Sequence, residues 1–172
     1  MILTLGHSVR PVEQTLALLR EDRVTSLADV RAYPRSRRNP QYNSDAFAAA
    51  LQESGIKYRH LPALGGMRTP KADSVNQALA EGFRGYADYM QTPEFEAALS
   101  ELIAMAERQQ LAIMCAEAKP AECHRSLISD ALSARGVAVK HIIGLGIVEP
   151  HTYTRSAEVH GTHVTYPFSL EG

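Results

Sequence analysis

The 172-residue chain has no tryptophan, only two cysteines and no excess of charge, since 18 basic and 19 acidic residues leave a formal net charge of −1. No stretch reaches the roughly 18 consecutive apolar residues of a membrane-spanning helix, so no membrane partner is expected. The near-zero charge argues against a long nucleic-acid footprint, and any electrostatic attraction must be local. Residues 1–6 lack the basic and long apolar segments of a signal peptide. We therefore expect a cytoplasmic protein whose cysteines are free thiols, metal ligands or a redox pair rather than a structural disulfide.

The chain does have short apolar runs that alternate with amphipathic segments. The runs typical of buried strands are 2–5, 26–31, 56–61, 111–114 and 137–143. Helical patterns start near Pro11, Ser44, Gly85, Thr92 and Pro120. This alternation predicts a single-domain, three-layer, doubly wound α/β fold with a mostly parallel five-stranded sheet and helices on both faces.

The order of the five strands is predicted as 3-2-1-4-5, with strands one and four as neighbours at the switch point where ligands of such folds bind. Residues 1–145 form the expected α/β domain. Residues 146–172 are a C-terminal extension with weaker patterning. Within it, residues 163–168 are expected to form an edge strand or to contact a second copy of the chain.

The stretch 111–125 carries the densest set of reactive groups. Cys115 and Glu117 follow a buried apolar run, and Pro120 suits the first position of a helix. The expected first turns of that helix contain Cys123, His124 and Arg125. A helix N-terminus supplies free backbone N–H groups and a positive dipole end. Thiols, a carboxylate, an imidazole and a guanidinium are thus expected to converge there.

Polar residues also close three other predicted strands. His7 and Ser8 follow the first, Asp29 and Arg31 close the second, and His60 lies near the end of the third. Because the carboxyl ends of parallel strands meet at one edge of a sheet, these groups are expected to lie near the thiols.

Residues 32–43 contain two prolines, two asparagines and three arginines, a composition typical of a loop. Together with the end of the second strand, it holds Arg31, Arg35, Arg37 and Arg38. Guanidinium groups suit phosphate recognition through bidentate hydrogen bonds. The alternative interpretation is a solvated surface loop.

A second loop, 62–70, is a candidate mobile lid or anion-binding nest. Its members of interest are Gly65, Gly66 and Arg68. Tyr86 and Tyr89 follow in a short helix and either stack on a base or pack in the core.

The candidate roles divide into two sets. The catalytic candidates are Cys115, Glu117, Cys123, His124, His7 and Asp29. The candidates for binding substrate or anion are Ser8, Arg31, Arg35, Arg37, Arg38, His60, Gly65, Gly66, Arg68, Tyr86, Tyr89 and Arg125. No cofactor is predicted. Zinc or iron at Cys115, Cys123 and His124 is the alternative, although their spacing matches no standard zinc pattern.

Several short motifs of the chain resemble an uncharacterised bacterial and archaeal family known as domain of unknown function 488. The matching pieces are Leu5-Gly-His-Ser8, Asp29-Val-Arg31 with Pro34-Arg-Ser36, Tyr58-Arg-His-Leu-Pro62 with Leu64-Gly-Gly66, Gly85-Tyr-Ala-Asp-Tyr-Met90, and Met114-Cys-Ala-Glu117 with Cys123-His-Arg125. They span about residues 3–145. The resemblance implies an α/β fold and supports the same site residues, but it implies no established activity.

Three functions fit these patterns. The first is an enzyme acting on a phosphorylated substrate, a nucleotide or nucleic acid, with a cysteine as candidate nucleophile and Glu117 or a histidine as acid or base. The second is a non-catalytic module that binds nucleic acid or another anion. The third is a cysteine-based metal or redox site. The first is our working hypothesis, with a phosphate-bearing small molecule or short nucleic acid as partner.

Overall fold

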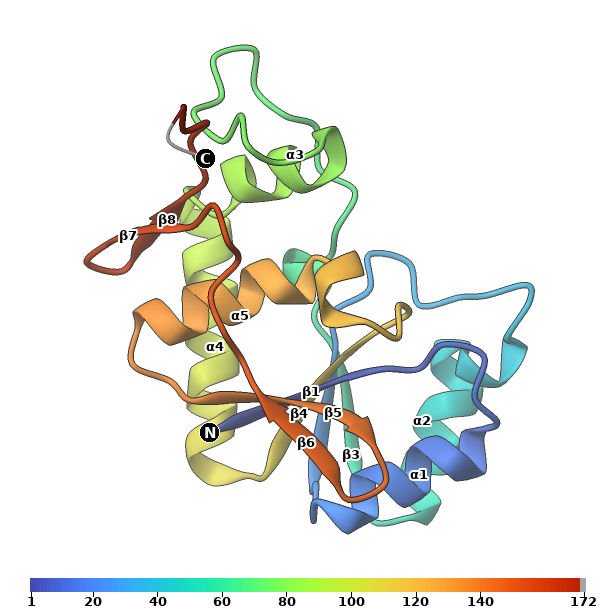
Figure 1. The fold of residues 1–172 in the computed structure, drawn as a ribbon. Helices are drawn as coiled ribbons and strands as arrows, with labels where there is room; N and C mark the ends of the chain where they lie inside the picture. The colour runs from blue at the N-terminus through green and yellow to red at the C-terminus, as the bar shows by residue number, and fades with distance from the viewer. Residues whose placement is uncertain (171–172) are drawn as a thin grey trace.

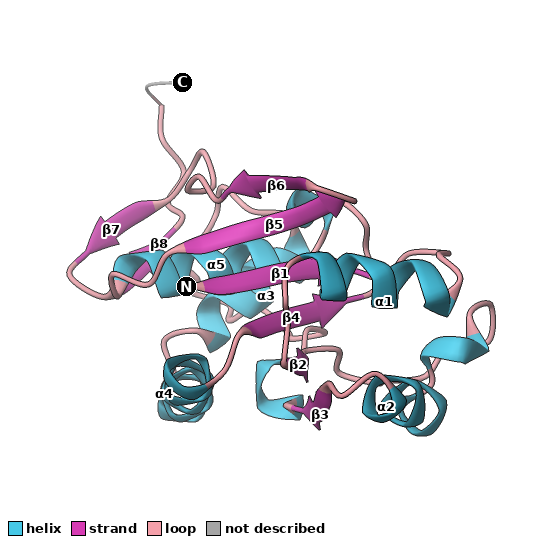
Figure 2. Cartoon of the chain, turned by 90° about the horizontal axis from the view of Figure 1, so that it is seen from below, coloured by secondary structure: helices cyan, strands magenta, loops and turns pink. Residues whose placement is uncertain are grey.

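The computed structural model describes residues 1–170, and over these residues the fold is α/β with a mostly parallel central sheet of six strands (Figures 1 and 2). The strands are β1 (Ile2–Gly6), β2 (Ser26–Asp29), β3 (Lys57–His60), β4 (Leu111–Cys115), β5 (Val139–Gly144) and β6 (Ile147–Pro150). The helices are α1 (Val12–Glu21), α2 (Ser44–Glu53), α3 (Glu81–Tyr89), α4 (Pro93–Arg108) and α5 (Arg125–Ala134). A separate hairpin pairs β7 (Glu158–His160) with β8 (His163–Thr165). The predicted fold class is confirmed.

The strand order is β3-β2-β4-β1-β5-β6, which Figure 2 shows from β3 to β6 across the sheet. The predicted order was therefore wrong: β1 and β4 are neighbours as expected, but their positions are exchanged. Both are five-residue strands buried on every position. Because either strand could fill either central position, the local pattern does not decide between them. Long-range pairing of β4 with β2 and of β5 with β1 does.

The two faces of the sheet are covered by different helices, as side-chain alternation in the strands requires. In β4, Leu111, Ile113 and Cys115 pack on the side of α3, α4 and α5. Ala112 and Met114 pack on the opposite side with residues of α1 and α2. The thiol of Cys115 is thereby directed toward the start of α5.

Thr92 caps α4 as expected, because its hydroxyl oxygen accepts a hydrogen bond from the Phe95 N–H at 3.3 Å. The expectation that Pro120 is the first residue of a helix containing residues 123–125 was wrong. Pro120 opens a single 3₁₀ turn (Pro120–Glu122), and α5 begins only at Arg125. The reason is that Cys123 has extended backbone, with φ −135° and ψ 148°, which separates the turn from the helix.

The C-terminal extension adds β6 antiparallel to β5 at the edge of the sheet, which is the sixth strand. Residues 163–168 do not form the sheet edge: their only strand, β8, pairs with β7. The extension then returns to α5, where Tyr166 is buried. In residues 1–170, no helix has the length and apolar character needed to cross a membrane.

A cluster that we call the tail network fixes this extension. The Asp130 carboxylate on α5 accepts hydrogen bonds from His151 Nε2 at 2.7 Å, the Thr154 N–H at 3.1 Å and the Tyr166 hydroxyl at 2.7 Å. His151 Nδ1 lies 2.9 Å from His141 Nε2, and His141 Nδ1 lies 2.5 Å from the Thr4 hydroxyl. The tail network therefore consists of Thr4, Asp130, His141, His151, Thr154 and Tyr166.

Candidate functional site

A cleft of about 860 Å³ opens at the carboxyl ends of β1, β2 and β4. The predicted site residues that line it are His7, Ser8, Arg31, Arg35, Arg38, Gly66, Tyr86, Cys115, Glu117, Cys123 and His124. Those that do not line it are Asp29, Arg37, His60, Gly65, Arg68, Tyr89 and Arg125. The structure thus gathers residues from five separate segments around one cavity, at the edge of the sheet where they were expected.

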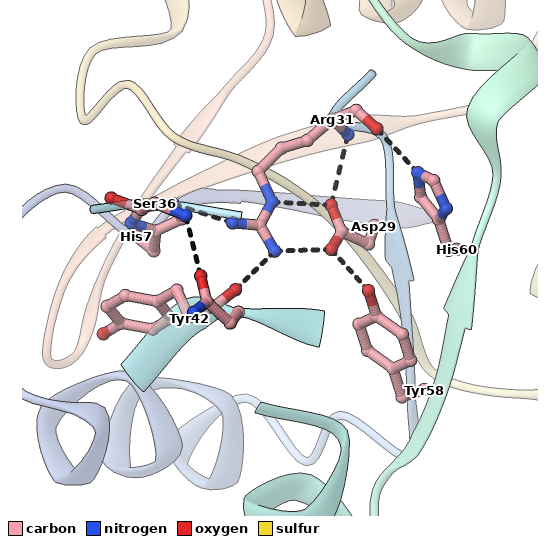
Figure 3. A network of polar contacts seen from close by, with 8 residues as sticks. His7, Asp29, Arg31, Ser36, Tyr42, Tyr58 and His60 are labelled. Atoms are coloured by element: carbon pink, nitrogen blue, oxygen red, sulfur yellow. Dashed lines mark hydrogen bonds and ion pairs between the residues drawn. The ribbon is translucent and has the colours of Figure 1, made fainter. Parts of the chain in front are cut away.

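One wall of the cleft rests on a buried ion pair between Asp29 and Arg31 (Figure 3). The guanidinium donates to both carboxylate oxygens, from Nε at 2.9 Å and from Nη2 at 2.7 Å. Nη2 also donates to the Tyr42 carbonyl oxygen at 2.8 Å, and the Tyr58 hydroxyl donates to Asp29 at 2.6 Å. We call these residues the arginine network, which consists of His7, Asp29, Arg31, Tyr42, Tyr58 and His60. It holds Arg31 rigid, so that a second anion meets a preorganised cation.

His7 completes this wall as a neutral imidazole. Its ring stacks on Tyr42 with centroids 4.2 Å apart, and Nδ1 donates to the Ser8 carbonyl oxygen at 2.7 Å. Nε2 is left as an acceptor 3.4 Å from Arg31 Nη1. Burial lowers the pKa of His7 to about 4, and the positive charge of Arg31 acts in the same direction. At neutral pH His7 Nε2 is therefore a hydrogen-bond acceptor.

His60 lies behind the wall rather than in the cleft. Its Nε2 donates to the Arg31 carbonyl oxygen at 2.7 Å (Figure 3). His60 thus supports the backbone of the arginine network instead of contacting a ligand.

Cys115 and Cys123, which we call the thiol pair, both line the cleft, and each thiol shifts the pKa of the other. Although burial opposes ionisation, the interaction with Cys123, the nearby Arg125 charge and the backbone at Glu117 together lower the pKa of Cys115. The pKa of Cys123 is raised, first by its interaction with Cys115 and then by burial. Cys115 is therefore the more readily ionised of the two, and as a thiol it donates to the Glu117 carbonyl oxygen at 3.7 Å.

Arg125 lies beneath the thiol pair and is fully buried. Nη2 donates to the carbonyl oxygens of Glu117 at 3.1 Å and Ala118 at 2.7 Å, which curls the loop after Cys115. Nε and Nη1 have no hydrogen-bond partner among residues 1–170. A buried cation without a counter-charge is costly. The Arg125 charge in turn lowers the pKa of Cys115, so ionisation of this thiol would supply a counter-charge.

Glu117 makes no ion pair with Arg125 in the described part of the chain. Its side chain is exposed at the cleft, and only its carbonyl oxygen receives Arg125. The close approach of this loop to β1 explains Gly6, where an added Cβ would lie 1.6 Å from the Glu117 carbonyl oxygen.

His124 connects the thiol pair to loop 62–70, which we call the glycine loop. Its Nε2 donates to the Val30 carbonyl oxygen at 2.8 Å, which leaves Nδ1 as an acceptor 3.5 Å from Cys123 Sγ. Burial lowers the pKa of His124, so the ring is neutral at pH 7. A Cβ on Gly66 would lie 3.3 Å from His124 Nδ1, so the glycine leaves room for this ring.

The two tyrosines of α3 position the glycine loop rather than offer a stacking surface. The Tyr86 hydroxyl donates to the Leu64 carbonyl oxygen at 2.7 Å, and the Tyr89 hydroxyl donates to the Ala63 carbonyl oxygen at 2.6 Å. Arg68 covers the Tyr89 ring, with its guanidinium carbon 3.7 Å from the centroid. Gly65 is packed closely against Ala32.

The sequence missed several cleft and network residues. Tyr58 lies two residues before His60 on β3, and both reach the arginine network (Figure 3). That two-residue spacing was a usable signal. The missed residues that line the cleft mouth are Val9, Tyr33, Met67 and Phe83. They lie in loops or at a helix start, where no periodicity singles them out.

No group of three His, Cys, Asp or Glu side chains in the described part of the chain is arranged to hold a metal ion. The proposed zinc or iron ligands Cys123 and His124 are neighbours, since His124 Nδ1 lies 3.5 Å from Cys123 Sγ while Nε2 donates to the Val30 carbonyl oxygen.

Comparison with known proteins gives one match. Neither curated protein sequences nor solved structures provide a relative of the chain. The family model described as "Domain of unknown function DUF488" matches residues 11–132. That match spans well over half of the chain and includes both thiols, Arg125 and every member of the arginine network except His7. The chain therefore belongs to the DUF488 family.

Proposed function

We propose that this protein is a cysteine-dependent enzyme that acts on a phosphate-bearing substrate, a nucleotide or a short nucleic acid. The observation that carries the proposal is the placement of Cys115 at the cleft near a buried guanidinium in which two nitrogens, Nε and Nη1, have no hydrogen-bond partner among residues 1–170. A low-pKa thiolate in a cleft is the usual arrangement of a cysteine nucleophile.

The roles follow from position. Cys115 is the nucleophile, and Arg125 stabilises its thiolate through charge without lining the cleft. Glu117 is the proposed acid or base, because its exposed carboxylate lines the cleft two residues after the nucleophile. His7 and Arg31 form the wall against which the substrate would rest.

The cleft mouth supports an anionic substrate. Arg35 and Arg38 line the cavity and are exposed, whereas Arg37, on the same loop, does not line it. Exposed guanidinium groups at the entrance of a cavity attract phosphate and bind it through charge-assisted hydrogen bonds. The near-zero net charge of the chain favours a small ligand over a long one.

The binding half of the proposal is tested by protection of Cys115 from iodoacetamide. Inorganic phosphate, nucleoside monophosphates and short 5′-phosphorylated oligonucleotides are added in turn, and the alkylation rate is measured by mass spectrometry. Protection that is lost in Arg35→Ala/Arg38→Ala but kept in the control Arg37→Ala supports the proposal. Absence of protection by every compound contradicts it.

The catalytic half is tested by turnover of the same compounds, followed by liquid chromatography and mass spectrometry. Cys115→Ser should reduce turnover by about 10²-fold or more, and Glu117→Gln by about 10²-fold. Glu122→Gln is the matched control, because Glu122 also lines the cleft but makes its ion pair with Lys119. Equal turnover by wild type and Cys115→Ser would refute a cysteine mechanism.

A non-catalytic anion-binding module is the second candidate, favoured by the low exposure of Cys115, which is 1 %. It predicts protection by phosphate compounds without turnover. The same assays therefore separate the two functions.

The setting of this activity belongs to the same proposal. Two unpaired thiols fit a reducing, cytoplasmic environment. We propose in addition that copies of the chain associate through residues 146–172, where Ile147 and Val159 are 55 % and 41 % exposed. Sedimentation of wild type against Ile147→Lys/Val159→Lys tests this contact, and a monomeric wild type would refute it.

A further inference from the structure

We propose that Cys115 and Cys123 form a reversible disulfide when a hydroperoxide enters the cleft, with Cys115 as the sulfur that is oxidised and Cys123 as the thiol that resolves it. This modification site goes beyond the proposed function and does not depend on the identity of a substrate. It rests on the arrangement of three neighbouring groups: the two sulfurs and His124.

The first group is the sulfur that meets the oxidant. Cys115 is 1 % exposed but lines the cleft, so a compact neutral oxidant can reach it more readily than a bulky reagent. The cation of Arg125 and the interaction with Cys123 favour its thiolate form, which is the form that reacts with peroxide.

The second group is a thiol that shares the cleft with the first. Cys115 and Cys123 both line the cleft and belong to the same core cluster, and each thiol shifts the pKa of the other, so the two sulfurs are neighbours. The segment between them, residues 116–122, is largely exposed, with a single 3₁₀ turn over 120–122. Because Arg125 holds the carbonyl oxygens of Glu117 and Ala118, residues 119–122 are the part that adjusts when the sulfurs approach.

The third group accepts the proton that Cys123 must lose. His124 Nδ1 lies 3.5 Å from Cys123 Sγ, and its role as an acceptor is fixed because Nε2 donates to the Val30 carbonyl oxygen. The high pKa of Cys123 would keep it protonated and slow as a nucleophile. An adjacent neutral imidazole removes this obstacle.

The steps balance in atoms and electrons. The Cys115 thiolate attacks one peroxide oxygen, the O–O bond breaks, and the leaving hydroxide takes a proton to become water. Sulfur is oxidised to sulfenic acid and the peroxide is reduced. Cys123 then passes its proton to His124 and attacks the Cys115 sulfur. The S–O bond breaks, hydroxide recovers that proton, and a disulfide and a second water result.

The test uses the full chain treated with hydrogen peroxide, denatured in the presence of N-ethylmaleimide and digested after glutamate. Cleavage after Glu117 and Glu122 places the two cysteines on different peptides. We expect a linked peptide pair two hydrogens lighter than the sum of its parts, which separates on treatment with dithiothreitol.

Variants distinguish the roles of the two sulfurs. Cys123→Ser should stop at a Cys115 sulfenic acid that dimedone traps, and Cys115→Ser should leave Cys123 unoxidised under the same conditions. His124→Gln should slow disulfide formation by at least about tenfold without slowing dimedone trapping in the Cys123→Ser background. Circular dichroism checks that each variant is folded, and Cys115→Ala replaces Cys115→Ser if the hydroxyl is not tolerated.

Two results would overturn the inference. One is wild type that accumulates Cys115 sulfinic acid while Cys123 stays free to react with N-ethylmaleimide. The other is oxidation of Cys123 at the wild-type rate in Cys115→Ser. Because the readout is a covalent bond, a failure of the proposed enzyme activity would leave this test unaffected.

Discussion

The arginine network and the tail network are both built around one buried carboxylate, but they differ in the partners of that carboxylate. Asp29 faces the permanent cation of Arg31, whereas Asp130 receives an imidazole, a hydroxyl and a backbone N–H. Only the arginine network borders the cleft, through His7 and Arg31. The comparison shows that a buried acid with a permanent cation shapes a wall of the cleft here, while a buried acid without one ties down a chain end.

The largest expected difference between the two networks comes from removing each carboxylate charge. Asp29→Asn leaves the Arg31 guanidinium buried without a counter-ion and should lower the free energy of unfolding by about 3–5 kcal/mol. Asp130→Asn weakens three hydrogen bonds but leaves no permanent cation unpaired, and should cost about 1–3 kcal/mol. Urea unfolding of both variants at pH 7 measures the difference. Equal costs would show that the fixed cation does not set the two networks apart.

A second prediction concerns β1, which carries Thr4 of the tail network and leads into His7 of the arginine network. Gly6→Ala places a Cβ against the Glu117 carbonyl oxygen and should cost about 1–3 kcal/mol or more, because backbone rather than a flexible side chain must move. It should also change the alkylation rate of Cys115. Thermal unfolding and alkylation measure the two effects.

Gly82→Ala is the control for Gly6→Ala, because it lies in α3 with nothing within 4 Å of its added Cβ. It should be neutral or slightly stabilising, since alanine favours helix. A Gly6→Ala variant as stable as Gly82→Ala would contradict the close contact.

A matched pair of tyrosines gives a third, smaller test. The hydroxyl of Tyr58 donates to Asp29 and that of Tyr166 donates to Asp130, at 2.6 and 2.7 Å. Tyr58→Phe and Tyr166→Phe should each cost about 1–2 kcal/mol, because each removes one hydrogen bond to a buried carboxylate. Only Tyr58→Phe should weaken phosphate protection of Cys115. The same loss of protection in Tyr166→Phe would mean that the two networks are coupled.

The smallest expected effect is a pH dependence that the networks share. Burial lowers the pKa of His7 and of His141 to about 4, with Arg31 adding to the effect at His7 and His151 at His141. Unfolded imidazoles have pKa values near about 6.5. Below that pH the unfolded chain binds more protons, so stability is complete above pH 6.5, declines as the pH falls, and stops declining near pH 4.

Single-histidine variants measure each contribution to this slope. Between pH 6.5 and 4, the slope of unfolding free energy against pH reports how many more protons the unfolded chain binds than the folded chain. His7→Gln and His141→Gln should each reduce that number by up to about one. Urea unfolding at half-unit pH steps provides the measurement. A slope that neither variant changes would mean that neither imidazole is neutral in the folded protein.

The sequence predicted the fold class and the end of the sheet where polar groups meet, for a physical reason. Apolar runs that end in His7, Asp29 and Cys115 mark strand ends, and parallel strands bring such ends together. Strand ends are encoded by short local stretches of the sequence. Strand order is not encoded locally, because β1 and β4 are alike in length and burial.

Contacts between distant segments were also beyond local patterns. Nothing near Tyr166 indicates that it meets Asp130, and nothing near Arg125 indicates that it donates to backbone carbonyl oxygens rather than to Glu117. The 3₁₀ turn after Pro120 escaped prediction because proline suits the first position of either helix type. Tyr58 could have been predicted, because it lies two residues from His60 and so points to the same face of the strand.

The central place of β1 has a consequence for the protein's biosynthesis. β1 leaves the ribosome first, yet both of its neighbours in the sheet, β4 and β5, are synthesised far later. Such non-local pairing folds slowly, since long loops must close before contacts form. β1 therefore has no sheet partner until residues 111–115 have been synthesised, so the centre of the sheet forms late in synthesis.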